Sequence, residues 1–382
     1  MIEVRTNRRT LVLLAGVALL AGCKVIPKGT DTGTPPAPEP SSNLPPDKAR
    51  HRVALLVPLT GPNAAMGQSV ANAANMAILD TNAQTIRITT YDTAAGPAAA
   101  ARQAMQDGNR LILGPLDGDQ VGAVASVARA SKVPLITFAN EPSVASRDVF
   151  AMGPSLENSL ERTVAYARSK GISKFAVLAP KTEYGARTSA AFAATVRAAG
   201  GTLVASESYD RGNSSIIGAT TRLKSKGSYQ AVLIADSPRY AAIAVPRLKS
   251  ARAVTPRILG TDQWSGDPQA SAAVLRGAWY SAIADSRFRQ FTVSYKARFG
   301  AAPYRQATLG YDAVLLTVRI ARDWRGGSAF PLGKLVDSGG FLGLDGPFRF
   351  NSTGISERAL EVRETRAGGV TVLSPAPEKF VD

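Results

Sequence analysis

The feature that most constrains the fold is a regular alternation of short apolar runs with amphipathic stretches, which begins at Arg52. The first runs are VALLVPL, IRITTYDT, LILGPL and VPLITFAN, and the stretches between them have the length and apolar spacing of helices. Strands and helices that alternate in this way form right-handed β-α-β crossovers, which build a parallel sheet covered on both faces. The sequence therefore predicts an α/β fold.

A second series of the same kind follows the run VFAMGP. Helical stretches over 156–169, 184–199 and 216–226 alternate with FAVLAP, GTLVASESY and QAVLIAD, and longer helices are predicted over 288–299 and 308–324. The chain closes with three short runs, FRFN, ALEVRETR and VTVLSP. This length of patterned chain is enough for two doubly wound parallel-sheet lobes, each with its own core.

The N-terminus has the layout of a secretory signal. Three arginines precede an apolar run over residues 11–20, which is shorter than the roughly 20 residues that span a bilayer. Small residues follow, and then Cys23, the only cysteine of the chain. The stretch LLAGC resembles the lipobox of bacterial lipoproteins, which implies that residues 1–22 are a lipoprotein signal peptide and that Cys23 is lipidated. The alternative is an unlipidated cysteine in an ordinary leader.

Residues 23–50 are predicted to be a tether between the lipidated cysteine and the folded part. Proline accounts for seven of the residues from Lys24 to Arg50, and the segment has no apolar periodicity. Such a composition favours an extended spacer over a packed element.

Several classes of enzyme are excluded by the sequence. The only histidine is His51, at the end of the tether, so a histidine-based triad or metal site within the fold is excluded. The phosphate-binding patterns G-x-G-x-x-G and G-x-x-x-x-G-K-[ST] and the nucleophile pattern G-x-S-x-G do not occur. Asp117 and Asp119 could formally act as an acid/base pair, although such loop carboxylates are more often caps. We predict no catalytic residue, no cofactor and no metal.

The chain is strongly basic, with a net charge of +16 that falls to +14 when residues 1–22 are removed. The lysines and arginines are spread over many segments, and no nucleic-acid recognition module accompanies them. The pattern favours a solvated basic surface. The alternative is attraction to an anionic partner such as a cell-wall polymer or lipid headgroups.

The order and spacing of several motifs resemble one known family. RVALLVPLTGPNAAMGQSVANAANMAI, LILGPLDGDQV, VPLITFAN, FAMGPSLEN and ILGTDQW look like the type I periplasmic binding proteins of the branched-chain amino-acid class, over 52–382. The resemblance implies a Venus-flytrap fold whose two lobes are joined by three crossing segments, near Gly153, near Asp285 and over 342–346. It assigns 51–153 and 286–340 to the first lobe, and 154–285 and 341–382 to the second.

Open α/β folds bind ligands in the loops after their strands, so those loops supply the candidate cleft residues. The candidates are Thr60, Gly61, Asp117, Asn140, Glu141, Tyr184, Asp236 and Asp262. The resemblance implies that Tyr184 and Asp262 hold the ammonium side of an amino acid. The first lobe departs from the family pattern, because carboxylates at 117, 119 and 141 would repel a ligand carboxylate.

A closer resemblance is to the C-terminal domain of the lipoprotein activators of penicillin-binding proteins. It rests on LLVPLTGPNAAMGQ, YDTAAG, GPLDGDQV and VLAPKTEYGAR. It implies a non-catalytic protein that activates or scaffolds a peptidoglycan synthase. Lys24 after the anchor implies the periplasmic side of the outer membrane. The alternative is the solute-binding component of an ABC importer for an amino acid or a related molecule, with a permease as partner. A third possibility is a sensor that reports a bound ligand to a membrane partner. An activator should have a filled or shut cleft, and a receptor a polar pocket.

Overall fold

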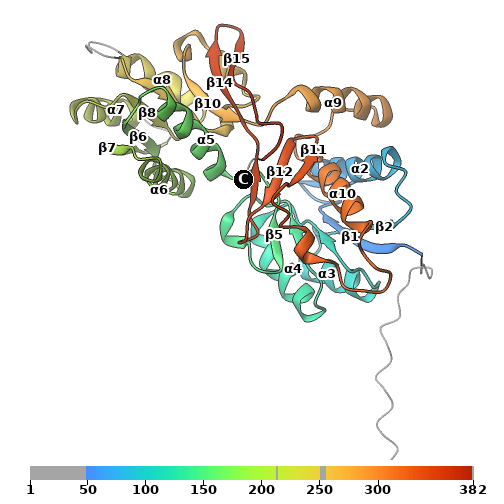
Figure 1. Cartoon of the computed structure of the whole chain (residues 1–382). Helices are drawn as coiled ribbons and strands as arrows, with labels where there is room; N and C mark the ends of the chain where they lie inside the picture. The colour runs from blue at the N-terminus through green and yellow to red at the C-terminus, as the bar shows by residue number, and fades with distance from the viewer. Residues whose placement is uncertain (1–48, 212–213, 250–254, 381–382) are drawn as a thin grey trace, which may run out of the picture. The chain divides into compact units, whose positions relative to one another are not determined.

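The computed structural model describes residues 49–211, 214–249 and 255–380 (Figure 1). Every described element lies within one compact unit, residues 42–382. The predicted signal peptide, Cys23 and most of the predicted tether lie outside the described residues.

The first sheet has five parallel strands in the order β2-β1-β3-β4-β5. The strands are β1 (His51–Val57), β2 (Ile86–Asp92), β3 (Ile112–Leu113), β4 (Leu135–Thr137) and β5 (Val149–Ala151). The helices that pack on it are α2 (Ala64–Asp80), α3 (Pro97–Gln106), α4 (Gly118–Ala130) and, from much later in the chain, α10 (Ala307–Ala321). The predicted doubly wound arrangement is confirmed for this sheet.

Alternate side chains of β1 enter two different apolar cores, as the period of a strand requires. Val53 and Leu55 pack in the core beneath α2 and α10, whereas Ala54 and Leu56 pack in the core beneath α3 and α4. Helix α9 (Ser286–Phe299) joins a smaller cluster with α2 through Phe291. Because both faces of β1 are buried, most of its residues are apolar in the sequence.

The second sheet has seven strands in the order β15-β14-β10-β9-β8-β6-β7. Five are parallel: β6 (Lys174–Pro180), β7 (Thr202–Tyr209), β8 (Ala231–Ile234), β9 (Arg257–Leu259) and β10 (Trp279–Ala282). Two antiparallel strands, β14 (Glu361–Arg366) and β15 (Gly369–Ser374), extend one edge. The helices are α5 (Leu156–Ser169), α6 (Glu183–Ala198), α7 (Ser215–Ser225) and α8 (Pro238–Lys249). Helices α5 and α6 pack on one face and α7 and α8 on the other.

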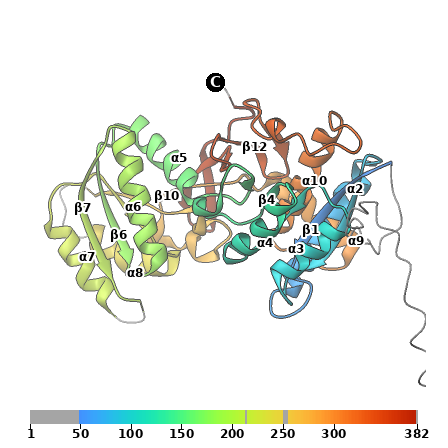
Figure 2. The same ribbon diagram turned by 90° about the horizontal axis from the view of Figure 1, so that it is seen from below.

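Short 3-10 helices occupy several connections: η1 (Pro142–Val144), η2 (Asp262–Trp264), η3 (Pro268–Ser271), η4 (Ala273–Leu275) and η5 (Leu332–Lys334). We propose a division into two lobes, one built around each large sheet. Figure 2 shows the two sheets as separate layers, each with its own helices.

The position of a third, three-stranded sheet differs from the expected division of the chain into lobes. It consists of β11 (Phe341–Gly343), β12 (Gly346–Phe350) and β13 (Ser356–Arg358). Residues 341–358 were expected in the second lobe, but Phe341, Phe348 and Phe350 lie in the same core as Val53 and Leu55 of β1. The physical reason is that this aromatic face is buried beside α10, so the segment joins the first lobe.

The third crossing is displaced as a result. The chain passes from the small sheet to the second large sheet between β13 and β14, at Ala359 and Leu360, and not over 342–346. Two other segments, between β5 and α5 and between β10 and α9, also run from one large sheet to the other. Three separate segments therefore connect the two sheets.

Candidate functional site

A cavity of about 1020 Å³ is lined by residues of both large-sheet regions. The loops that line it follow β3, β4, β9 and β10, which are the carboxyl ends of parallel strands. This is the place at which open α/β sheets bind ligands, because the loops there converge around the switch in strand order. This cavity therefore coincides with the expected position of a cleft.

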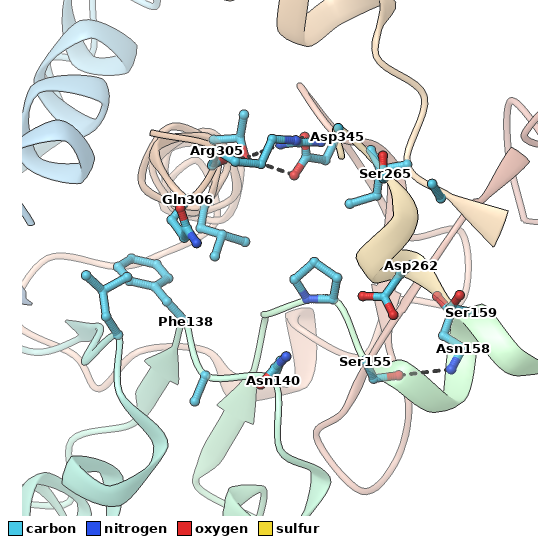
Figure 3. Close-up of a pocket in the computed structure, with 18 of the residues that line it drawn as sticks. Phe138, Asn140, Ser155, Asn158, Ser159, Asp262, Ser265, Arg305, Gln306 and Asp345 are labelled. Carbon is cyan, nitrogen blue, oxygen red and sulfur yellow. Dashed lines mark hydrogen bonds and ion pairs between the residues drawn. The ribbon is translucent and has the colours of Figure 1, made fainter. Parts of the chain in front are cut away.

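One wall comes from the loops after β3 and β4. The first loop places Leu116 and Asp117 on the cavity, and the second places Glu141 there. Phe138 and Asn140 of the second loop also line it (Figure 3). Burial, together with the charges of Asp119 and Glu141, raises the pKa of Asp117 above the usual range of an aspartate. The wall thus combines apolar surface with a group of carboxylates that repel one another.

The beginning of α5 forms another part of the lining. Ser155 caps the helix, since its hydroxyl accepts a hydrogen bond from the backbone N–H of Asn158 at 3.1 Å. Asn158 accepts a hydrogen bond from the backbone N–H of Arg358 at 2.9 Å, which ties this helix to the small sheet. All three crossings contribute lining residues, among them Pro154, Ile283 and Leu360.

The opposite wall carries Asp262, the first residue of η2, with Ser265 beside it (Figure 3). Burial raises the pKa of Asp262 to about 6, although the nearby Arg187 acts in the other direction. In the described part of the chain Asp262 forms no ion pair with a lysine or arginine. A carboxylate in this setting is ready to accept a cationic or hydrogen-bond-donating group.

The rim beside α10 is fixed by an internal ion pair. Arg305 donates a hydrogen bond to Asp345 at 2.7 Å, and the Thr308 hydroxyl donates to the other oxygen of Asp345 at 2.9 Å. Asp345 is buried, and its pairing neutralises the positive charge of Arg305 where that side chain meets the cavity. The ion pair of Arg305 and Asp345 fixes this part of the cavity lining and carries no net charge.

Of the sequence candidates, four line the cavity and four do not. Asp117, Asn140, Glu141 and Asp262 are on its surface, and their roles in binding stay predictions. The other four, Thr60, Gly61, Tyr184 and Asp236, are absent from the lining of this cavity.

The bonding of these four residues explains their positions. The Thr60 hydroxyl donates to Asp92 at 2.7 Å, and Gly61 adopts a positive φ of 74° in the turn before α2. The Tyr184 hydroxyl donates to the Thr261 side chain at 3.2 Å. Asp236 is fully buried and is bound to Tyr209, Arg211 and the backbone of Ser237.

The sequence did not identify several lining residues, notably Ser155, Asn158, Arg305 and Asp345. Ser155 is recognisable as a helix cap, since a serine directly precedes a helical stretch, but a cap carries no sign of a cavity. Arg305 and Asp345 are brought together from segments 40 residues apart, and no local pattern indicates that pairing.

Within the described ranges the protein has neither a metal-ligand cluster nor a helix that could span a membrane. No cluster of three or more histidine, cysteine, aspartate or glutamate side chains has a geometry that could hold a metal ion. No helix among these residues is both long and apolar enough to cross a bilayer.

Two α/β regions connected by three segments, with a cavity at the facing ends of their strands, define the class of two-lobed ligand-binding proteins. The sequence profile of the family described as periplasmic binding protein matches residues 51–354. The chain belongs to this periplasmic binding protein family, and its fold is the type I α/β fold of that family.

Solved structures agree with this fold. A Rhodospirillum rubrum protein described as a branched-chain amino acid ABC transporter aligns with a TM-score of 0.73 at 22% identity, over 85% of this chain and 100% of that one. The leucine binding protein LivK of Thermotoga maritima aligns with a TM-score of 0.57 at 19% identity, over 85% and 98%. Identities this low support the fold alone.

Curated relatives match over shorter stretches. The Leu/Ile/Val-binding protein BraC3 of Rhizobium johnstonii is 28% identical over 46% of this chain and 51% of its own length. The penicillin-binding protein activator LpoA of Photobacterium profundum is 30% identical over 37% of this chain and 24% of its own length. The chain thus spans about half or less of the length of these relatives, which fall into two functional classes.

Proposed function

We propose that this chain is a non-catalytic periplasmic protein that captures a small ligand in the cavity between its lobes. The observation that carries the proposal is the cavity itself, because a volume of about 1020 Å³ lies at the upper end of the range for small-molecule sites. An activator that had lost solute capture was expected to have a cleft filled by side chains or permanently shut. The cavity therefore supports the receptor alternative of the sequence analysis more than the activator.

The cellular role that fits ligand capture is the solute-binding component of an ABC importer, with a permease as its partner. The similarity to BraC3, named as a Leu/Ile/Val-binding protein, supports this role. The structural neighbours described as ABC transporter components support it at the level of the fold.

A second candidate is an activator or scaffold of a peptidoglycan synthase. The similarity to LpoA, named as a penicillin-binding protein activator, favours it, together with the lipobox-like stretch before Cys23 and the proline-rich tether. In this proposal Cys23 carries lipid and holds the protein on the periplasmic side of the outer membrane. The tether then lets the folded unit approach a synthase in the inner membrane.

A thermal-shift screen of residues 42–382, which contain every described element, tests ligand capture. The probes are amino acids, short peptides, aromatic acids, polyamines and muropeptides. A ligand at a hundred times its dissociation constant adds about 2.7 kcal/mol to stability. The matched variants are Asn140→Trp, at an exposed residue on the cavity, and Gln290→Trp, at an exposed residue of α9 outside the lining.

A shift that disappears in Asn140→Trp and persists in Gln290→Trp supports ligand capture in the cavity. The absence of a shift with every probe rejects it. If the full chain in that case still retains a purified bifunctional peptidoglycan synthase in a pull-down, the activator becomes the better account.

A further inference from the structure

The charge of the cavity wall is opposite to that of the protein. The chain has a net charge of +16, yet six of the residues that line the cavity are carboxylates and only two are arginines. The carboxylates are Asp117, Asp119, Glu141, Asp262, Asp285 and Asp345, and the arginines are Arg289 and Arg305. An acidic lining within so basic a chain requires an explanation.

Internal pairing removes two of the six carboxylates from consideration. Asp345 is bound by Arg305 at 2.7 Å, and Asp285 lies 2.8 Å from Arg363. Arg289 is exposed to solvent, where its charge is screened. Four carboxylates remain, at 117, 119, 141 and 262, and of these Asp119 is exposed like Arg289, whereas the other three are partly buried.

Three of these four lie together on the first-lobe wall. The Oε2 atom of Glu141 is shielded from solvent and accepts no hydrogen bond from any residue that the structure describes. The same atom lies 2.5 Å from the position that a Cβ of Gly118 would take, so the carboxylate is pressed against the start of α4. Burial is the largest cause of the raised pKa of Asp117, and the repulsion from Asp119 and Glu141 that adds to it would be relieved by a cation.

The fourth carboxylate stands alone on the second-lobe wall. Asp262 is largely removed from solvent, which accounts for its raised pKa. The backbone N–H groups of Asp262 and Gln263 and the charge of Arg187 oppose this rise in pKa, and Arg187 also lies 3.8 Å from Glu157. Asp262 is thus a second, independent carboxylate that is directed into the cavity without an ion-pair partner (Figure 3).

We propose that the cavity selects a small organic cation with amino groups at both ends and no free carboxylate, of the diamine or polyamine class. This proposal rests on ligand capture as proposed above. An amino group at one end would meet the first-lobe carboxylates, and one at the other end would meet Asp262, each through charge-assisted hydrogen bonds. A free amino acid fits less well, because its carboxylate would lie near one of the two acidic walls. A bare metal ion also fits less well, since no described carboxylate cluster has metal-binding geometry.

Isothermal titration calorimetry of residues 42–382 tests the proposal with spermidine, 1,5-diaminopentane, leucine and benzoate as probes. Wild type should bind the two amines and neither leucine nor benzoate. Asp262→Asn and the double variant Asp117→Asn/Glu141→Gln should each weaken amine binding about tenfold or more, because each removes hydrogen bonds to a charged group. Glu183→Gln changes the net charge by the same amount as Asp262→Asn, at an exposed residue outside the lining, and should alter affinity less than twofold.

The outcomes separate this inference from the proposed function. Binding of leucine or benzoate in place of the amines would overturn the charge selection and leave ligand capture intact. If Glu183→Gln weakens amine binding as much as the cavity variants do, the amines are attracted to the protein surface in general. That result would also overturn the proposed selection of cations by the cavity. If no probe binds and the broader screen shows no shift, both proposals fail together. Melting temperatures of the variants, measured without ligand, establish that each is folded.

Discussion

Two aspartates at strand ends of the second lobe, Asp236 and Asp262, look equivalent in the sequence and differ in their bonding. Asp236 is fully buried and bound by Tyr209 and Arg211, whereas Asp262 faces the cavity without an ion-pair partner. Removal of one partner from a buried ion pair is strongly destabilising, because it leaves the other group buried and unpaired. We infer that the first is structural, and a binding role of the second stays a prediction.

Asp236→Ala should lower the free energy of unfolding by about 2 to 4 kcal/mol, because it leaves Tyr209 and Arg211 without their acceptor. It should leave ligand affinity unchanged, since Asp236 does not line the cavity. Urea denaturation measures the first effect and calorimetry the second. Asp210→Ala, which breaks an exposed pair with Lys181, is the control and should cost less than about 0.5 kcal/mol.

Asp262→Asn should stabilise the unliganded protein at neutral pH. The folded-state pKa of about 6 lies above the ordinary aspartate pKa of 3.8, so the folded state favours the protonated form. The cost of the charged form is absent below pH 3.8, grows as the pH rises to about 6, and is complete above it. The free energy of unfolding of the variant should therefore exceed that of wild type by about 1 to 3 kcal/mol at pH 7.5, and the two should be nearly equal at pH 4.

The neighbouring charges that bear on this titration are Arg187 of α6 and Glu157 of α5. Chemical denaturation at the two pH values provides the measurement. An equal effect at pH 4 and pH 7.5 would show that the gain has another origin than the Asp262 charge.

At the scale of elements, α10 and the small sheet are joined through one buried carboxylate. Asp312 of α10 accepts hydrogen bonds from the backbone N–H groups of Leu344, at 2.6 Å, and Asp345, at 3.3 Å. Burial and the nearby charge of Asp345 raise the pKa of Asp312, and the buried Arg358 opposes this. Gly343 permits the contact, since a Cβ there would lie 2.3 Å from the Asp312 carboxyl carbon.

Gly343→Ala should therefore lower the free energy of unfolding by about 1 to 3 kcal/mol, the usual cost of overpacking a core. Gly122→Ala in α4, where nothing lies within 4 Å of the added Cβ, is the matched control and should raise it by about 0.5 to 1 kcal/mol. Thermal unfolding of both variants provides the comparison. Similar melting temperatures for the two would contradict the packing argument.

The alternating strands and helices could be predicted from the sequence because each run is buried on a defined face and its period is local. VALLVPL and FAVLAP become the β1 and β6 strands for this reason. The attachment of β11–β13 to the first lobe could not be predicted, because a short aromatic strand carries no sign of which core receives it. Strand-end carboxylates such as Asp117 and Asp262 could be placed near a cleft, whereas the pair of Arg305 and Asp345 depends on long-range packing.

At the scale of the whole molecule, the predicted anchor and the folded unit should be separable. Cys23→Ser should release the protein from the membrane fraction of cells, because a protein without its acyl chains loses stable attachment. The melting temperature and amine affinity of the released protein should match those of residues 42–382. Fractionation followed by mass spectrometry of the N-terminal peptide measures lipidation, and continued membrane association of Cys23→Ser would point to another anchor.

The three crossings do more than connect the sheets, because Pro154, Ile283 and Leu360 all lie on the cavity surface. A bound molecule would therefore contact the three connecting segments, about which the lobes would turn, as well as the lobes themselves. A lever magnifies a small displacement near its pivot into a larger one at its far end, so a change of a few tenths of an ångström at these segments would be multiplied along each lobe. The size of an occupant could thus be reported at surfaces that never touch it.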